Sequence, residues 1–93
     1  MTPEVTDRVS KATAILRSEG ACEVYLFGSF AEGQARPGSD LDLAVTGLPP
    51  KRYFHAVGRL LDELLIPVDL IDLDRPTPFV RRLRESGRLH RVG

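Results

Sequence analysis

Two aspartates separated by one residue, Asp40 and Asp42, stand at the start of an apolar segment that runs to Val45. Side chains on a β-strand alternate between its two faces, so both carboxylates are expected on the same side. Carboxylates that close repel each other, and a hard divalent cation between them relieves the repulsion. The pair therefore predicts a magnesium site, although an exposed polar strand face would produce the same pattern.

A Gly-Ser pair, Gly28-Ser29, directly follows the apolar run 22–27 and opens a short helical segment that Gly33 closes. Glycine lets the backbone approach a ligand closely, and a helix N-terminus offers unpaired N–H groups and a positive dipole end. The serine hydroxyl adds a further donor. These properties favour phosphate binding, whereas the alternative interpretation is a plain turn in which the serine acts as a helix cap.

A third acidic segment, residues 68–73, carries Asp69 and Asp72. They are three positions apart, so on a regular strand they point to opposite faces, and at most one can join the Asp40–Asp42 site. Asp69 is flanked by apolar residues, where a carboxylate without a partner is costly, whereas Asp72 lies nearer the strand end and is readily solvated. The pattern favours Asp69 as the functional residue.

Hydrophobic periodicity predicts the elements that position these groups. An amphipathic helix is expected over 4–18, with Thr2 as N-cap, Pro3 in the first helical position and Gly20 as the stop. Strands are expected at 22–27, 40–45 and 68–73, and further helices after Gly28, over 51–65 and from Phe79 onward. The order αβαβαβα predicts the α/β (α+β) class, with a small mixed sheet of at least three strands and about four helices.

Length and composition limit the organisation of the chain. With 93 residues we expect one domain over 1–93, without room for a separate substrate domain. No apolar run approaches the roughly 20 residues that span a bilayer, and the N-terminus lacks the apolar core of a secretory signal, so a cytoplasmic location without membrane attachment is expected. The lone Cys22 is interpreted as a small buried residue.

Charge is unevenly distributed along the chain. Residues 1–74 hold seven Lys/Arg and twelve Asp/Glu, whereas residues 75–93 hold six Arg and one Glu. This asymmetry indicates a polar docking surface at the C-terminal end, or a solvated helix face, and it argues against direct nucleic-acid binding.

The combination of these motifs resembles the DNA polymerase beta-like nucleotidyltransferase superfamily. It consists of Gly28-Ser29, ten intervening residues, the Asp40-x-Asp42 pair and a third aspartate on a later strand. The strings 28–33, 36–45 and 68–73 are similar to its smallest prokaryotic branch, the minimal nucleotidyltransferases, and the resemblance covers the chain in length and element order. One departure is Glu32, where family members often carry Arg. We therefore expect the Glu32 side chain to point away from the triphosphate, and nucleotide affinity to be modest.

The resemblance implies a role for each matching residue. Asp40, Asp42 and Asp69 would be the catalytic, magnesium-binding carboxylates, with Asp69 also activating the acceptor hydroxyl. Gly28 and Ser29 would hold the β- and γ-phosphates of a nucleoside triphosphate, which is expected to be ATP. The reaction would move AMP to a hydroxyl and release pyrophosphate, and two metal ions on carboxylates would neutralise the charge.

The resemblance also implies a partner. Minimal nucleotidyltransferases are typically paired with a helical HEPN-domain protein as the antitoxin of a toxin–antitoxin pair, and that protein would supply the acceptor hydroxyl. Two alternatives remain at this stage. One is a non-catalytic antitoxin-type module that neutralises its partner by docking through Arg81, Arg82 and Arg84. The other is a small acidic α/β metal- or ligand-binding domain without transferase activity.

Overall fold

The computed structural model describes residues 3–93. Helix α1 (Pro3–Ser18) begins at the proline expected in its first turn, and the predicted N-cap Thr2 lies outside the described residues. The helix buries one apolar flank: Val9, Ala12, Ile15 and Leu16. The chain then turns at Gly20, which has a φ of +113° that a side chain would strain.

Four strands form one mixed sheet, which confirms the predicted class. They are β1 (Glu23–Phe27), β2 (Leu41–Thr46), β3 (Val68–Asp72) and β4 (His90–Arg91), in the spatial order β3-β2-β1-β4. β2 pairs with β3 in parallel, whereas β1 pairs with β2 and with β4 in antiparallel orientation. The sequence patterns did not predict β4, because a strand of two residues carries no periodicity and exists only through its pairing with β1.

The remaining helices are α2 (Gly28–Ala31), α3 (Tyr53–Leu64) and α4 (Pro78–Glu85). A 3-10 turn (Pro50–Arg52) leads into α3. The hydroxyl of Thr77 accepts a hydrogen bond from the backbone N–H of Val80 at 3.1 Å and so caps α4. No described helix is long and apolar enough to cross a membrane.

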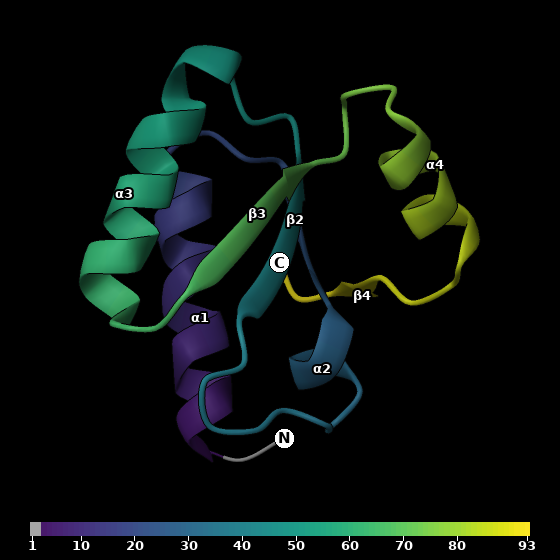
Figure 1. Cartoon of the computed structure of the whole chain (residues 1–93). Helices are drawn as coiled ribbons and strands as arrows, with labels where there is room; N and C mark the ends of the chain where they lie inside the picture. The colour runs from purple at the N-terminus through teal and green to yellow at the C-terminus, as the bar shows by residue number, and fades with distance from the viewer. Residues whose placement is uncertain (1–2) are drawn as a thin grey trace.

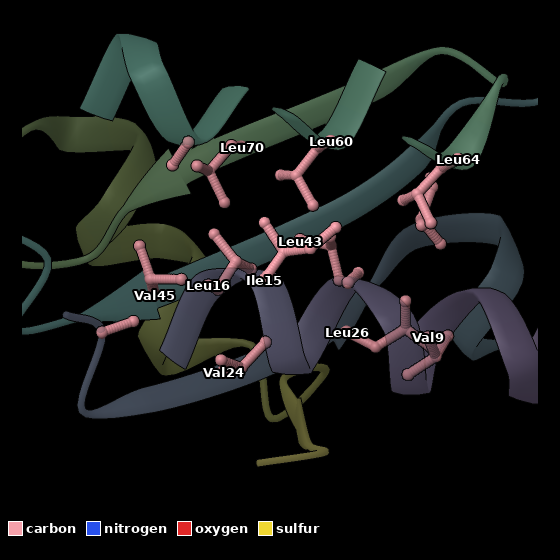
Figure 2. Close-up of a cluster of buried hydrophobic side chains, with 14 of the residues drawn as sticks. Val9, Ile15, Leu16, Val24, Leu26, Leu43, Val45, Leu60, Leu64 and Leu70 are labelled. Atoms are coloured by element: carbon pink, nitrogen blue, oxygen red, sulfur yellow. The ribbon is translucent and has the colours of Figure 1, made fainter. Parts of the chain in front are cut away.

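The main core lies between one face of the sheet and the helices α1 and α3, which lie on the same side in Figure 1. Figure 2 shows Leu43 and Val45 of β2 pointing toward the apolar residues of these helices, with Leu26 of β1 and Leu70 of β3 beside them. Since neighbouring strand residues alternate between faces, Asp42 and Ala44 point to the opposite face.

That opposite face is only partly covered. A smaller apolar cluster joins Phe27, Ala44 and Leu73 to Val80 of α4. α4 lies on the far side of the sheet from α1 and α3 (Figure 1). Asp69, at the start of β3, stays exposed, so this face has a covered end and an open end.

The interpretation of Cys22 as a buried residue was wrong. The residue is exposed, and it lies outside both apolar clusters. It directly precedes β1, and its backbone N–H donates to the carbonyl of Thr46 at 2.8 Å. The backbone of Cys22 thus continues the β1–β2 pairing while its side chain faces solvent.

Candidate active site

Strand register brings two of the predicted carboxylates together. In the parallel β2–β3 pair Asp42 lies opposite Asp69, and in the antiparallel β1–β2 pair it lies opposite Phe27, the residue before Gly28. Directly paired positions carry side chains on the same face of a sheet. Asp42 therefore lies in the middle of a row that runs from the Gly28-Ser29 turn to Asp69.

The turn after β1 lies directly against Asp42. Gly28 has a φ of +72°, and a Cβ built on it would overlap the carboxylate of Asp42. No side chain caps the N-terminus of α2 within the described part of the chain, so Ser29 is not used as the plain cap of the alternative interpretation. Glycine at this position therefore provides both the backbone conformation and the space for the carboxylate.

Asp40 lies one residue outside β2, because the strand begins at Leu41 and not at residue 40 as predicted. Its side chain is exposed, whereas that of Asp42 is half-buried. Burial raises the pKa of Asp42 above its ordinary value of 3.8, and the charges of Asp69 and Asp40 raise this pKa further. Both neighbouring carboxylates thus act on Asp42 electrostatically.

The structure separates Asp69 from Asp72. Asp69 is exposed, so the predicted cost of burying its carboxylate does not arise, and its relation to the site comes from its register with Asp42. Asp72 lies opposite Val45 at the other end of β3, and its carboxylate accepts a hydrogen bond from the backbone N–H of Asp74 at 2.9 Å. The carboxylate of Asp72, the last residue of β3, therefore stabilises the turn that follows the strand.

The donor chemistry of this row fits magnesium, which prefers carboxylate and phosphate oxygens. Among residues 3–93, no group of three or more His, Cys, Asp or Glu side chains is arranged to hold a metal ion by itself. Magnesium is commonly held by one or two carboxylates together with substrate phosphates, so a complete protein cage is not required. Joint coordination by Asp40, Asp42 and Asp69 stays a prediction.

The loop before Asp40 contains a basic residue, Arg36, to which the sequence patterns assigned no role. Arg36 and Ser39 close a tight turn: the N–H of Arg36 donates to the Ser39 hydroxyl at 2.8 Å, and the N–H of Ser39 donates to the Arg36 carbonyl at 2.9 Å. The guanidinium of Arg36 forms no hydrogen bond or ion pair with any other described residue. The Pro-Gly turn between these residues is the signal that could have indicated this fixed geometry.

Glu32, the residue that departs from the family pattern, is paired. Its carboxylate lies 3.4 Å from a guanidinium nitrogen of Arg88, in the segment after α4. The opposite charge of Arg88 compensates the acidic residue beside α2.

Comparison with known proteins adds to this geometry. Residues 10–89 match the model of the family described as Polymerase beta, Nucleotidyltransferase. No match was found among the curated proteins. Among solved structures, a chain from the crystal structure of a toxin–antitoxin with AMP-PNP superposes with a TM-score of 0.73 and 26% identity, over 89% of this chain and 70% of that chain.

Two further structures are similar. A chain of a toxin–antitoxin MntA–HpeT mutant, with two aspartates separated by one residue replaced by glutamate, has a TM-score of 0.70 and 25% identity over 89% of this chain and 70% of that chain. A chain from a tri-AMPylated Shewanella oneidensis HEPN toxin in complex with MNT antitoxin has a TM-score of 0.68 and 23% identity over 94% and 70%, respectively. The last of these supports the fold alone.

Proposed function

The chain belongs to the polymerase beta nucleotidyltransferase family, and from that premise we propose that it transfers AMP from ATP, with magnesium, to a hydroxyl group on a helical HEPN-domain partner. The observation that carries this proposal is the row formed by Gly28, Asp42 and Asp69, which sets a phosphate-binding turn beside two carboxylates on the open face of the sheet. We assign residues 1–93 to one catalytic domain, and we propose that it acts in the cytoplasm, where ATP is available.

The residues of the candidate site have different proposed roles in the reaction. Backbone N–H groups at Gly28 and the hydroxyl of Ser29 bind the β- and γ-phosphates. Asp40, Asp42 and Asp69 would hold magnesium, which would supply charge neutralisation at the phosphates and polarise the phosphoryl oxygens. Arg36 offers a further positive charge in the loop that leads to Asp40, and its guanidinium is not engaged within the described residues.

The transfer itself is a displacement at the α-phosphorus. Asp69, which is exposed, accepts the proton of the acceptor hydroxyl as that oxygen bonds to the α-phosphorus. The bond between the α-phosphorus and its bridging oxygen to the β-phosphate breaks, and pyrophosphate leaves with the electron pair. Most of the catalysis comes from positioning and charge neutralisation, because phosphoryl-type transfers need little covalent chemistry from the protein.

The partner is inferred from the similar structures. A toxin–antitoxin bound to AMP-PNP, and an MntA–HpeT mutant with two aspartates at the spacing of Asp40 and Asp42 changed, support a nucleotide-dependent antitoxin role. The non-catalytic alternative relied on an arginine docking face. One of those arginines, Arg84, donates to the carbonyl of Leu73 at 3.0 Å, so part of its side chain is engaged inside the domain.

A label-transfer experiment tests the proposal. The protein is mixed with magnesium, a HEPN-domain partner and ATP labelled at either the α- or the γ-phosphate. We expect label on the partner only from the α-position, with loss of transfer in Asp42→Asn and normal transfer in Asp7→Asn, an exposed aspartate on α1. Neutralisation of the partner without any label transfer would instead establish the non-catalytic binding module.

A further inference from the structure

Most of the exposed large apolar side chains in the described part of the chain lie on or directly after one helix, α3. Among residues 3–93 they are Phe54 (81% exposed), Leu61 (44%) and Leu65 (84%) on or directly after α3, and Phe79 (42%) on α4. Positions 54, 58, 61 and 65 follow one side of a helix. We refer to Phe54, Gly58, Leu61 and Leu65 as the α3 stripe.

The neighbouring flank of α3 is already used within the fold. His55 and Arg59 both bond the carboxylate of Glu19, at 2.8 and 3.0 Å, and so attach this flank to the end of α1. The α3 stripe faces away from α1 and has no such partner. Together with Phe79 of α4, the three apolar side chains of the stripe expose on the order of 500 Å², which is more than half of the ~800 Å² that each partner buries in a standard interface.

Leu65 is unusual in two independent respects. It has a φ of 59°, the left-handed conformation in which a side chain is strained and glycine is preferred at a helix end. Among residues 3–93 it is also the most exposed of the large apolar residues. A strained and solvated leucine contributes little to the stability of the isolated domain, so its side chain is available to a partner.

A cleft of about 460 Å³ lies at the other end of the stripe. Its walls include Phe54 and Tyr53 of α3, Leu70 of β3, and Phe79 and Val80 of α4. The hydroxyl of Tyr53 donates to the carbonyl of Leu70, so it occupies the outer edge of β3 at this point. An added β-strand would have to displace this contact, whereas an inserted apolar side chain would leave it in place.

The α3 stripe matches itself under a twofold rotation. Phe54 and Leu65 lie at equal distances from the midpoint between Gly58 and Leu61, so two antiparallel copies of α3 set each Phe54 opposite Leu65 and each Gly58 opposite Leu61. Gly58 has open space above its Cα, with nothing within 4 Å of a built Cβ, and a leucine fits there. The same rotation brings Asp62 of one copy to the level of His55 and Arg59 of the other.

From this geometry we propose that the α3 stripe is the interface of a homodimer, in which Leu65 of each copy inserts into the cleft beside Phe54 of the other. The interface is isologous: each copy contributes the same projecting leucine and the same cleft. The inference does not depend on the proposed transferase activity, because the interface lies outside the row formed by Gly28, Asp42 and Asp69.

Sedimentation equilibrium of the purified chain over a range of concentrations tests the proposal. We expect a mass of twice the 10.3 kDa chain at the upper concentrations. Two variants are expected to shift the protein to monomer: Leu65→Gly removes the projecting side chain, and Gly58→Glu places a charge in the centre of the stripe. Arg17→Ala, on the exposed side of α1, is the matched control and should leave the dimer unchanged.

Stability measurements distinguish a lost interface from a damaged fold. Glycine relieves the left-handed strain at position 65, and glutamate is a better helix former than glycine at position 58, so the fold of each variant should be at least as stable as that of the wild-type monomer. A wild-type chain that is monomeric at every concentration overturns the proposal and leaves a different protein as the occupant of the stripe. So does a dimer that persists in both variants.

Discussion

At the junction of α1 and α3 the carboxylate of Glu19 is contacted by basic side chains, whereas at the start of β2 the charged groups that act on Asp42 are two other carboxylates. Glu19 is buried, accepts hydrogen bonds from His55 and Arg59, and lies 3.8 Å from Arg52. The hydrogen bonds from His55 and Arg59 lower the pKa of Glu19. The charge of Glu19 is thus satisfied by residues of the same chain.

Asp42 shows the reverse situation. Its pKa is raised by burial and then by the charges of Asp69 and Asp40, and no described cation is paired with it. A carboxylate in such surroundings costs stability unless a cation arrives from outside the chain. An acidic side chain removed from solvent stabilises the fold when basic residues of the same chain are paired with it, as at Glu19. Without such a basic partner, as at Asp42, the acid is a candidate for function.

The sharpest test of this comparison is Asp42→Asn. We expect transfer activity to fall by roughly 10²–10³-fold, because the proposed function makes Asp42 a ligand of the phosphate-bound cation. The melting temperature without magnesium should stay equal or rise, since repulsion with Asp69 and Asp40 disappears. Labelled transfer and thermal melts measure both effects. A much lower melting temperature would show that Asp42 belongs to the fold in the way Glu19 does.

Gly28→Ala should affect both stability and activity. A side chain at a φ of +72° costs about 1–2 kcal/mol, and the added methyl group overlaps the carboxylate of Asp42. Chemical denaturation should record this loss, together with weaker nucleotide binding in a titration with ATP. Gly87→Ala, also at a φ of +72° but with no atom near a built Cβ, is the matched control for backbone strain alone. Equal nucleotide affinity in both variants would contradict the close approach of phosphate to Gly28.

Glu19→Gln should act on the fold and leave the chemistry alone. The neutral side chain keeps the shape of Glu19 but removes the charge that His55 and Arg59 contact, so the melting temperature should fall. Transfer per folded molecule should stay at the wild-type level. Glu63→Gln, which removes only the surface pair of Arg59 four residues earlier, should cost about 0.5 kcal/mol or less. A loss of activity greater than the loss of folded protein would show that Glu19 also affects the candidate active site.

Acidification should reduce the difference in melting temperature between Glu19→Gln and the wild type, and also that between Asp42→Asn and the wild type. The reasons are opposite in the two cases. The folded pKa of Glu19 lies below its ordinary value of 4.5, so its stabilising effect is present above that value and is lost as the pH falls through the folded pKa. The folded pKa of Asp42 lies above 3.8, so its destabilising charge disappears as the pH falls through that raised pKa. Melts from about pH 7 to about pH 4 should bring Asp42→Asn toward the wild type, and extending them to about pH 2 should do the same for Glu19→Gln. If the difference in melting temperature between Asp42→Asn and the wild type widened in acid, the charge of Asp42 would not be destabilising as assigned.

Much of the fold could be predicted from local patterns. The periodicity of α1 and α3, and the β-rich runs before Gly28 and after Pro67, located these elements to within a few residues. β4 could not be predicted, because its two residues become a strand only beside β1. The ionic cluster of Glu19 was missed for a similar reason: its partners lie more than 30 positions away in the chain, and no local pattern connects them.

For the candidate site, the sequence by itself determined the residue types and their order: a Gly-Ser turn, two aspartates one residue apart, and a third acidic segment on a later strand. Tertiary structure decided that Asp69 and not Asp72 lies beside Asp42, and that Gly28 lies against the same carboxylate. The physical reason is that strand pairing sets register through contacts distant in sequence, and a shift of one residue would turn these side chains to the other face.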